Sequence, residues 1–129
     1  MANPNIVSVA TILGGNAGWN LSASTTATLL TVTAEYILKI NRIVCANVDG
    51  GSAADLDLFV DGMGSGTTGI TTTGADATVY LAKTIAVPAD SSLVVSDTPI
   101  YLMEGDILKG GTASTSDLDL FISYETLID

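Results

Sequence analysis

The chain has 129 residues, and its 4 basic and 14 acidic side chains give it a net charge of −10. This charge argues against direct binding of nucleic acid, because an acidic surface repels phosphate backbones. The sequence contains no histidine, so the usual general base, the usual zinc ligand and a Ser-His-Asp triad are all excluded. We therefore expect a protein that is not an enzyme and that carries no cofactor and no metal.

The residue pattern predicts an all-β protein. Hydrophobic residues make up 47% of the chain but aromatic residues only 5%, and Thr, Ser, Gly and Ala are abundant, which suits short strands better than helices. The length fits one domain spanning residues 1–129. Eight or nine short strands predict an antiparallel β-sandwich, jelly-roll-like in topology, with a closed up-and-down barrel as the alternative.

The first quarter of the chain carries no charged side chain before Glu35. We expect a first strand over Ile6–Leu13, a break at Gly14–Gly18, and Trp19 at one end of the core. Two interpretations of this uncharged stretch stay open. It forms a buried first hairpin, or residues 1–13 form an arm or exchanged strand that packs on another subunit.

A second strand is predicted over Thr26–Thr33 and a long third strand over Tyr36–Val48. In the third strand Leu38, Ile40, Val44, Ala46 and Val48 share one face by alternation. Arg42 falls on that apolar face, so we expect a β-bulge near Asn41 and Arg42 that turns the guanidinium outward. Cys45 has no partner for an intrachain disulfide and is predicted to be a small buried hydrophobe.

A turn at Asp49–Ser52 is predicted to form a hairpin into the next strand. That strand contains Asp-Leu-Asp-Leu-Phe at Asp55–Phe59, and the same pentapeptide returns at Asp117–Phe121. Alternation places the leucines of both copies on one buried face and the aspartates and phenylalanines on the other. We expect the acids to form a solvated exterior rather than a calcium site, because calcium needs six to eight converging oxygen ligands. Phe59 and Phe121 then face outward and need cover from a loop or a partner subunit.

The remaining elements follow from turn residues and alternation. The Gly-rich stretch Gly62–Gly74 lacks the Gly-Lys-Ser/Thr ending of a phosphate-binding loop, so we expect a surface loop that could make contacts in an assembly. A loop is also expected at Gly110–Ser116. Further strands are predicted at Ala77–Val87, Ser92–Asp97, Pro99–Met103 and Ile107–Lys109, before the second copy of the pentapeptide.

The sequence shows no secretory signal pattern and no apolar run of membrane-spanning length. With a single cysteine, this predicts a soluble protein made in a reducing compartment and without membrane partners.

Several segments resemble a family of small virion structural proteins of marine tailed bacteriophages, notably cyanophages. The resemblance covers nearly the whole length, is weakest at Gly62–Gly74, and is carried by turns and core strands rather than by a chemical signature. The segments are Met1–Val7, Ala46–Gly50, Ala53–Asp55, Ala82–Asp90, Leu93–Val95, Pro99–Leu102, Glu104–Asp106 and Ser123–Glu125.

This resemblance implies a particle component made in the cytoplasm of the host bacterium, with no catalytic residues. The favoured hypothesis is a capsid decoration (cement) protein, a homotrimer on the outside of the major capsid protein lattice. A neck, tail or fibre-attachment protein is the alternative, and a carbohydrate- or host-binding module is the third hypothesis. The candidate interface residues are Ile6, Val7, Val9, Trp19, Phe59, Met63, Ile70 and Phe121.

Overall fold

The computed structural model describes residues 11–62, 77–113 and 117–128. Within these ranges every regular element is a strand, and the predicted all-β class is confirmed. The strands are β1 (Thr11–Asn20), β2 (Thr28–Thr31), β3 (Tyr36–Asn47), β4 (Ala54–Asp61), β5 (Val79–Val87), β6 (Ser92–Ser96), β7 (Ile100–Leu102), β8 (Ile107–Thr112) and β9 (Leu118–Ile128).

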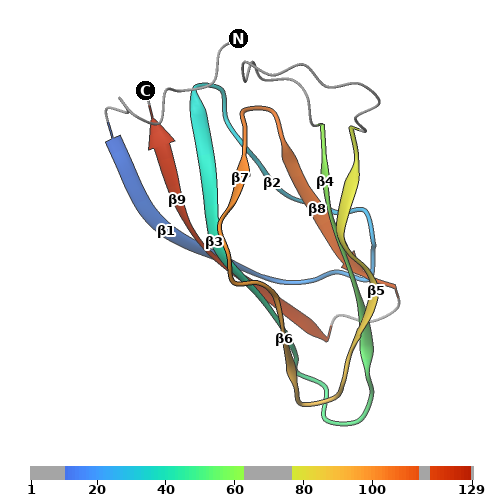
Figure 1. Ribbon diagram of the computed structural model, residues 1–129. Coiled ribbons are helices and arrows are strands. Elements are labelled where there is room, and N and C mark those ends of the chain that lie inside the picture. Colours follow the sequence, from blue (N-terminus) through green and yellow to red (C-terminus); the bar gives the residue numbers. More distant parts are fainter. Residues whose placement is uncertain (1–10, 63–76, 114–116, 129) are drawn as a thin grey trace.

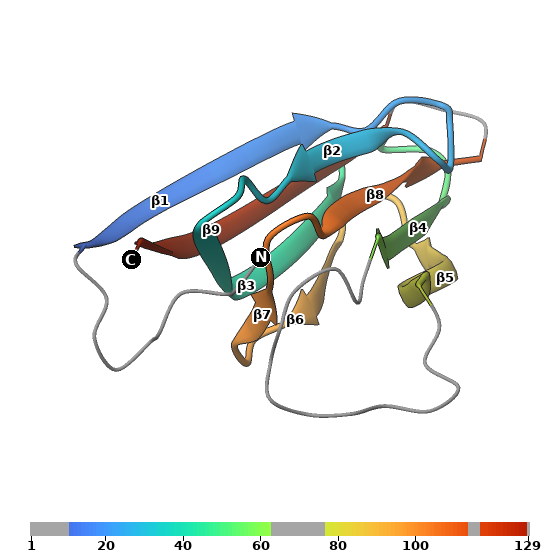
Figure 2. The ribbon, with the colours of Figure 1, turned by 90° about the horizontal axis from the view of Figure 1, so that it is seen from above.

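The strands form two antiparallel sheets that face each other (Figure 1; Figure 2 shows the two layers from above). One sheet has the order β1-β9-β3-β6, with β7 also paired to β3, and the other has the order β2-β8-β4-β5. The ladders of the described strands stay within one sheet or the other. The sandwich prediction is therefore confirmed and the closed-barrel alternative is wrong.

The strand order is that of a jelly roll. β6 and β7 pair with successive parts of β3, so together they count as one interrupted strand. The antiparallel pairs then run in order from the two ends of the sequence toward its middle. They are β1 with β9, β2 with β8, β3 with β6 and β7, and β4 with β5. A long hairpin folded over on itself gives this order, and it produces the two Greek keys of a jelly roll.

The two copies of Asp-Leu-Asp-Leu-Phe occupy interior strands of opposite sheets. β4 lies between β8 and β5, and β9 lies between β1 and β3. Their aliphatic side chains fill the space between the sheets, as predicted, and each buried leucine contributes about 1.5 to 3 kcal/mol by leaving water. The six residues are Leu56, Leu58, Val60, Leu118, Leu120 and Ile122.

The predicted β-bulge in β3 is present. Ile40 pairs with Tyr124 and Arg42 with Ser123, so Asn41 is an extra residue in β3, and Arg42 is exposed. The bulge also reverses which residues of β3 face the core. Ile43 and Cys45 are buried after it, so the prediction that Val44, Ala46 and Val48 share the core face is wrong.

Three predicted turns or loops differ from the structure. The glycine-rich segment 14–18 lies inside β1, where it pairs with residues 121–125 of β9. Gly110 lies in β8, which runs on to Thr112. The turn at residues 49–52 leads from β3 in one sheet to β4 in the other, so it is not a hairpin. In each case glycine, a frequent turn residue, lies either within a strand or in a connection between the two sheets.

The thiol of Cys45 is enclosed in the core, as predicted. Burial, with a smaller effect of the Asp119 charge, raises its pKa from 9.0 to about 11. Only about a thousandth of the thiol is then ionised at pH 8, and the thiolate is the reactive form.

We expect the folded protein to react very slowly with a disulfide reagent such as Ellman's reagent at pH 8, and to react fully within minutes in denaturant. Absorbance of the released thiolate measures both rates. Rapid stoichiometric reaction of the folded protein would contradict this placement of Cys45.

Candidate interaction site

Phe59 is covered by its own chain. Its side chain is only 5% exposed, the Tyr80 ring lies 4.9 Å from it at an interplanar angle of 39°, and the Lys109 Nζ lies 5.8 Å from its ring centroid. Phe59 does face away from the leucine side of β4, as predicted. The expectation that a partner contacts it is corrected, because Tyr80 of β5 and Lys109 of β8 leave little of the ring accessible.

The acids on the same face of β4 also have partners within the chain. Asp57 is 5% exposed and accepts a hydrogen bond from the Thr84 backbone N–H at 2.7 Å. Asp61 accepts bonds from the Thr78 hydroxyl at 2.7 Å and from the Gly62 N–H at 2.9 Å. Together with Lys109 these bonds lower the pKa of Asp61. The prediction of a wholly solvated acidic face is wrong for Asp57, which fixes the backbone of β5.

Phe121 is 47% exposed, although it occupies the same place in the repeated pentapeptide as Phe59. The cross-strand neighbours explain the difference, because side chains directly opposite each other in a sheet cover one another. Phe121 lies between Gly18 of β1 and Val44 of β3. A glycine and a valine cannot cover a phenyl ring in the way that Tyr80 and Lys109 cover Phe59.

An apolar row crosses the outer face of the β1-β9-β3-β6 sheet at this level. It consists of Gly18, Phe121, Val44 and Val94, which are successive cross-strand partners. Val94 is exposed like Phe121, and a hollow of about 370 Å³ lies beside the phenyl ring. The residues that line the hollow are Gly18, Trp19, Asn20, Val44, Ala46, Asp119, Leu120 and Phe121.

Polar groups border the apolar row on both sides. Toward one end of the strands, the Asn20 side-chain amide donates a hydrogen bond to Asp119 at 2.9 Å. Toward the other end, Arg42 stands opposite Ser123, and beyond it Lys39 and Glu125 form an ion pair at 3.8 Å. The outer face therefore presents an apolar centre with a carboxylate on one side and a guanidinium on the other. This arrangement of an apolar core and a polar rim is typical of protein interfaces.

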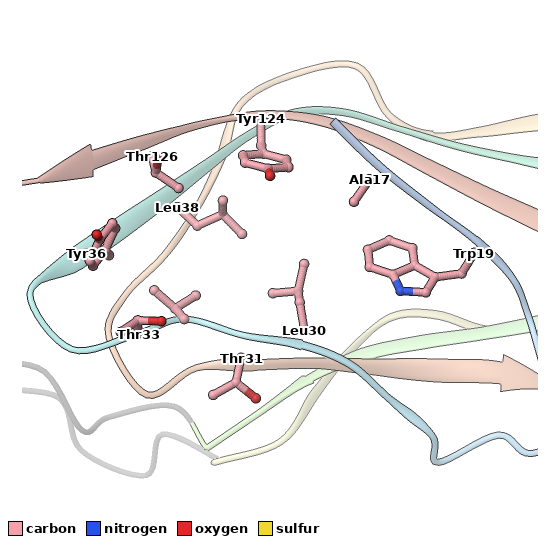
Figure 3. Close-up of a pocket in the computed structure, with 10 residues that line it drawn as sticks. Ala17, Trp19, Leu30, Thr31, Thr33, Tyr36, Leu38, Tyr124 and Thr126 are labelled. Atoms are coloured by element: carbon pink, nitrogen blue, oxygen red, sulfur yellow. The ribbon is translucent and has the colours of Figure 1, made fainter. Parts of the chain in front are cut away.

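Trp19 faces the interior of the sandwich rather than its outer face. It packs against the core cluster and lines a second cavity of about 370 Å³ between the sheets. Figure 3 shows this cavity, which we call the Trp19 pocket. Its lining residues are Ala17, Trp19, Leu30, Thr31, Val32, Thr33, Tyr36, Leu38, Tyr124 and Thr126.

The sequence interpretation missed the other aromatic residues of the pocket. Tyr36 and Tyr124 reach it from β3 and β9. Had the glycine-rich segment 14–18 been assigned to a strand, alternation would have placed Ala17 and Trp19 on one face of β1.

Two acids are buried in the connection between β7 and β8. Glu104 accepts a hydrogen bond from the Glu35 N–H at 2.9 Å, and Asp106 accepts one from the Met103 N–H at 2.9 Å. Burial raises the pKa of Asp106 despite that bond. Both acids stabilise turns. Among the described residues there is no cluster of three or more metal-ligating side chains, and no helix there is long and apolar enough to cross a membrane.

Five candidate interface residues, Ile6, Val7, Val9, Met63 and Ile70, lie outside the described residues. Of the proposed arm, residues 11–13 belong to β1 and pair with residues 126–128 of the same chain. Phe121 is therefore the candidate that combines an outward position with an exposed ring. No family model, curated protein or solved structure matches the chain.

Proposed function

We propose that this chain is a virion structural protein without enzymatic activity, and that it is a capsid decoration protein bound to the outside of the major capsid protein lattice. The apolar row around Phe121 is the observation that carries the proposal. It is an exposed apolar surface on a rigid sheet, and such surfaces mark sites of protein–protein contact. The resemblance to virion proteins of tailed phages supports the same function.

The size of this face fits an interface that works by repetition. Four strands about 4.8 Å apart, over the seven residues from Asp119 to Glu125, present about 400 Å² of sheet. A stable interface between two proteins usually buries about 800 Å² on each partner. Each contact through this face alone is therefore weak, and many contacts repeated over a lattice, or within a homotrimer, give strong retention.

The mechanism follows from that geometry. A sandwich that contacts two neighbouring capsid subunits opposes their separation when packaged DNA presses outward. The net charge of −10 makes unbound copies repel one another and keeps them soluble until they reach the capsid.

Replacing Phe121 by serine is expected to abolish binding to capsids. The substitution removes the largest apolar side chain of the row, and central aromatic anchors commonly contribute 2 kcal/mol or more, which is roughly a thirtyfold change in affinity per contact. Co-sedimentation of the purified protein with undecorated capsids of the parent phage measures the effect.

Ile85→Ser is the matched control, because Ile85 is 41% exposed and lies on β5 of the opposite sheet. We expect this variant to bind as the unmodified protein does, with both variants checked for cooperative unfolding. If the Phe121→Ser variant still bound capsids, the apolar row would not be part of the interface.

A neck, tail or fibre-attachment location is the alternative for the same fold, and it would use the same face with fewer copies. A carbohydrate- or host-binding module is the less favoured candidate. Its support is the Trp19 pocket, which three aromatic side chains line. Binding of the unmodified protein to a glycan array, lost on Trp19→Ala, would favour that function over the virion structural one.

A further inference from the structure

The Trp19 pocket has the size and lining of a small-molecule site. Its volume of about 370 Å³ lies within the usual range of ligand pockets, roughly 300 to 1,000 Å³. It lies on the inner side of the β1-β9-β3-β6 sheet, opposite the apolar row, and between strands that belong to both sheets. The lining includes the exposed residues Thr31 and Thr33, so the cavity is open to solvent.

The chemistry of the lining is mostly apolar with a few polar atoms. Leu30, Leu38 and the Trp19 ring surround the centre, and the hydroxyl of Tyr124 points into it (Figure 3). Neither the Trp19 indole N–H nor the Tyr124 hydroxyl hydrogen-bonds to another residue of the described chain. None of the lining residues is charged. A charged ligand would lose part of its hydration here without gaining a group of opposite charge.

Gly15 gives the Tyr124 ring its place in the pocket wall. The two residues are cross-strand partners, and a Cβ atom at position 15 would lie 2.9 Å from both Cζ and the hydroxyl oxygen of Tyr124. The ring therefore rests against the bare backbone of β1. Any side chain at position 15 would push the ring out of this position. Gly14, the preceding residue, has nothing within 4 Å of its Cβ position.

We propose that the Trp19 pocket binds a small neutral ring compound, largely apolar, that carries a hydroxyl or carbonyl group. The ring packs against Trp19, Leu30 and Leu38. Its polar group bonds to the Tyr124 hydroxyl or the Trp19 N–H. This site is independent of the proposed capsid contact, which uses the other side of the sheet.

Titration with three probes of similar size tests the charge preference: cyclohexanol, cyclohexanecarboxylate and cyclohexylammonium. Trp19 is the only tryptophan of the chain, so its fluorescence reports directly on the pocket. We expect cyclohexanol to change the emission saturably, and both charged probes to bind at least about tenfold more weakly because their charge must be desolvated. An unsaturable response to cyclohexanol, or equal binding of a charged probe, would overturn the proposal.

Two variants locate the binding. Gly15→Ala displaces the Tyr124 ring and is expected to weaken cyclohexanol binding about tenfold, as a loss of packing and of one hydrogen bond. Gly14→Ala is the matched control and should bind as the unmodified protein does.

Tyr124→Phe keeps the ring and removes the hydroxyl, so it tests the site even if Gly15→Ala does not fold, and we expect it to bind about fivefold more weakly. Unchanged binding by folded Gly15→Ala or by Tyr124→Phe contradicts the assignment. All these measurements use the isolated protein, so their outcome is separate from that of the capsid-binding test.

Discussion

Replacing Gly111 by alanine is expected to prevent the chain from folding stably. The Cβ atom of the new residue would lie about 1.9 Å from the carbonyl oxygen of Ser24 and 2.9 Å from that of Ser22. Both are backbone atoms of the segment that lies alongside β8, and this segment is itself bonded to β8, where the Thr112 N–H donates to the Ser22 carbonyl at 3.2 Å. The clash cannot be relieved by rotating a side chain.

The expected loss in the free energy of unfolding is at least about 3 kcal/mol, since overpacking against backbone exceeds the usual cost of an added methyl group. A domain of this size has a total stability of about 5 to 15 kcal/mol, so the variant should be largely unfolded or melt far below the unmodified protein. Denaturant unfolding followed by circular dichroism measures the difference. Gly14→Ala is the control, and its stability should change by less than about 0.5 kcal/mol. A stable Gly111→Ala protein would mean that residues 22–24 do not lie against Gly111 of β8.

The two phenylalanines of the repeated pentapeptide are expected to differ sharply when each is replaced by alanine. Phe59→Ala removes a ring that is packed against Tyr80 and Lys109, and it should lower the free energy of unfolding by about 3 kcal/mol. Phe121→Ala removes a ring that is nearly half exposed, and it should cost less than about 1 kcal/mol.

The two variants are each other's control, because the residue, the substitution and the four preceding residues are the same. Thermal or urea unfolding of both measures the difference. Equal losses would contradict the structure, and in particular the assignment of the cover over Phe59 to Tyr80 and Lys109. In binding to capsids the effects of the two positions should be reversed, with Phe121→Ala impaired and Phe59→Ala, where folded, unaffected.

These two phenylalanines show what the sequence could predict and what it could not. Alternation correctly placed both rings opposite the leucines, because successive side chains of an unbroken strand point to opposite faces. Whether a ring is then covered depends on the strands beside it. Tyr80 and Lys109 are distant from Phe59 in sequence, and no local pattern indicates that they flank it.

The bulge in β3 could likewise be predicted from local sequence, whereas the place of the glycines within β1 could not. A charged residue on an apolar face was enough to predict the bulge at Asn41. Glycine, in contrast, is frequent in turns, so the sequence alone predicts a break at residues 14–18 and a loop from Gly110. Gly15 is a glycine because the Tyr124 ring lies against it. Such a contact between distant strands is invisible until the strand order is known, which is also why the Trp19 pocket was not predicted.

The copy number of this protein in purified particles tests the proposed function most directly. Under the proposed function a tailed phage encodes the chain, and quantitative mass spectrometry of that phage's virions gives its ratio to the major capsid protein. A decoration protein follows the symmetry of the capsid lattice, so we expect hundreds of copies per particle, in a fixed ratio to the major capsid protein. About a dozen copies, the number that a symmetric neck or tail ring would hold, or absence from the particle, would contradict the assignment to the capsid surface.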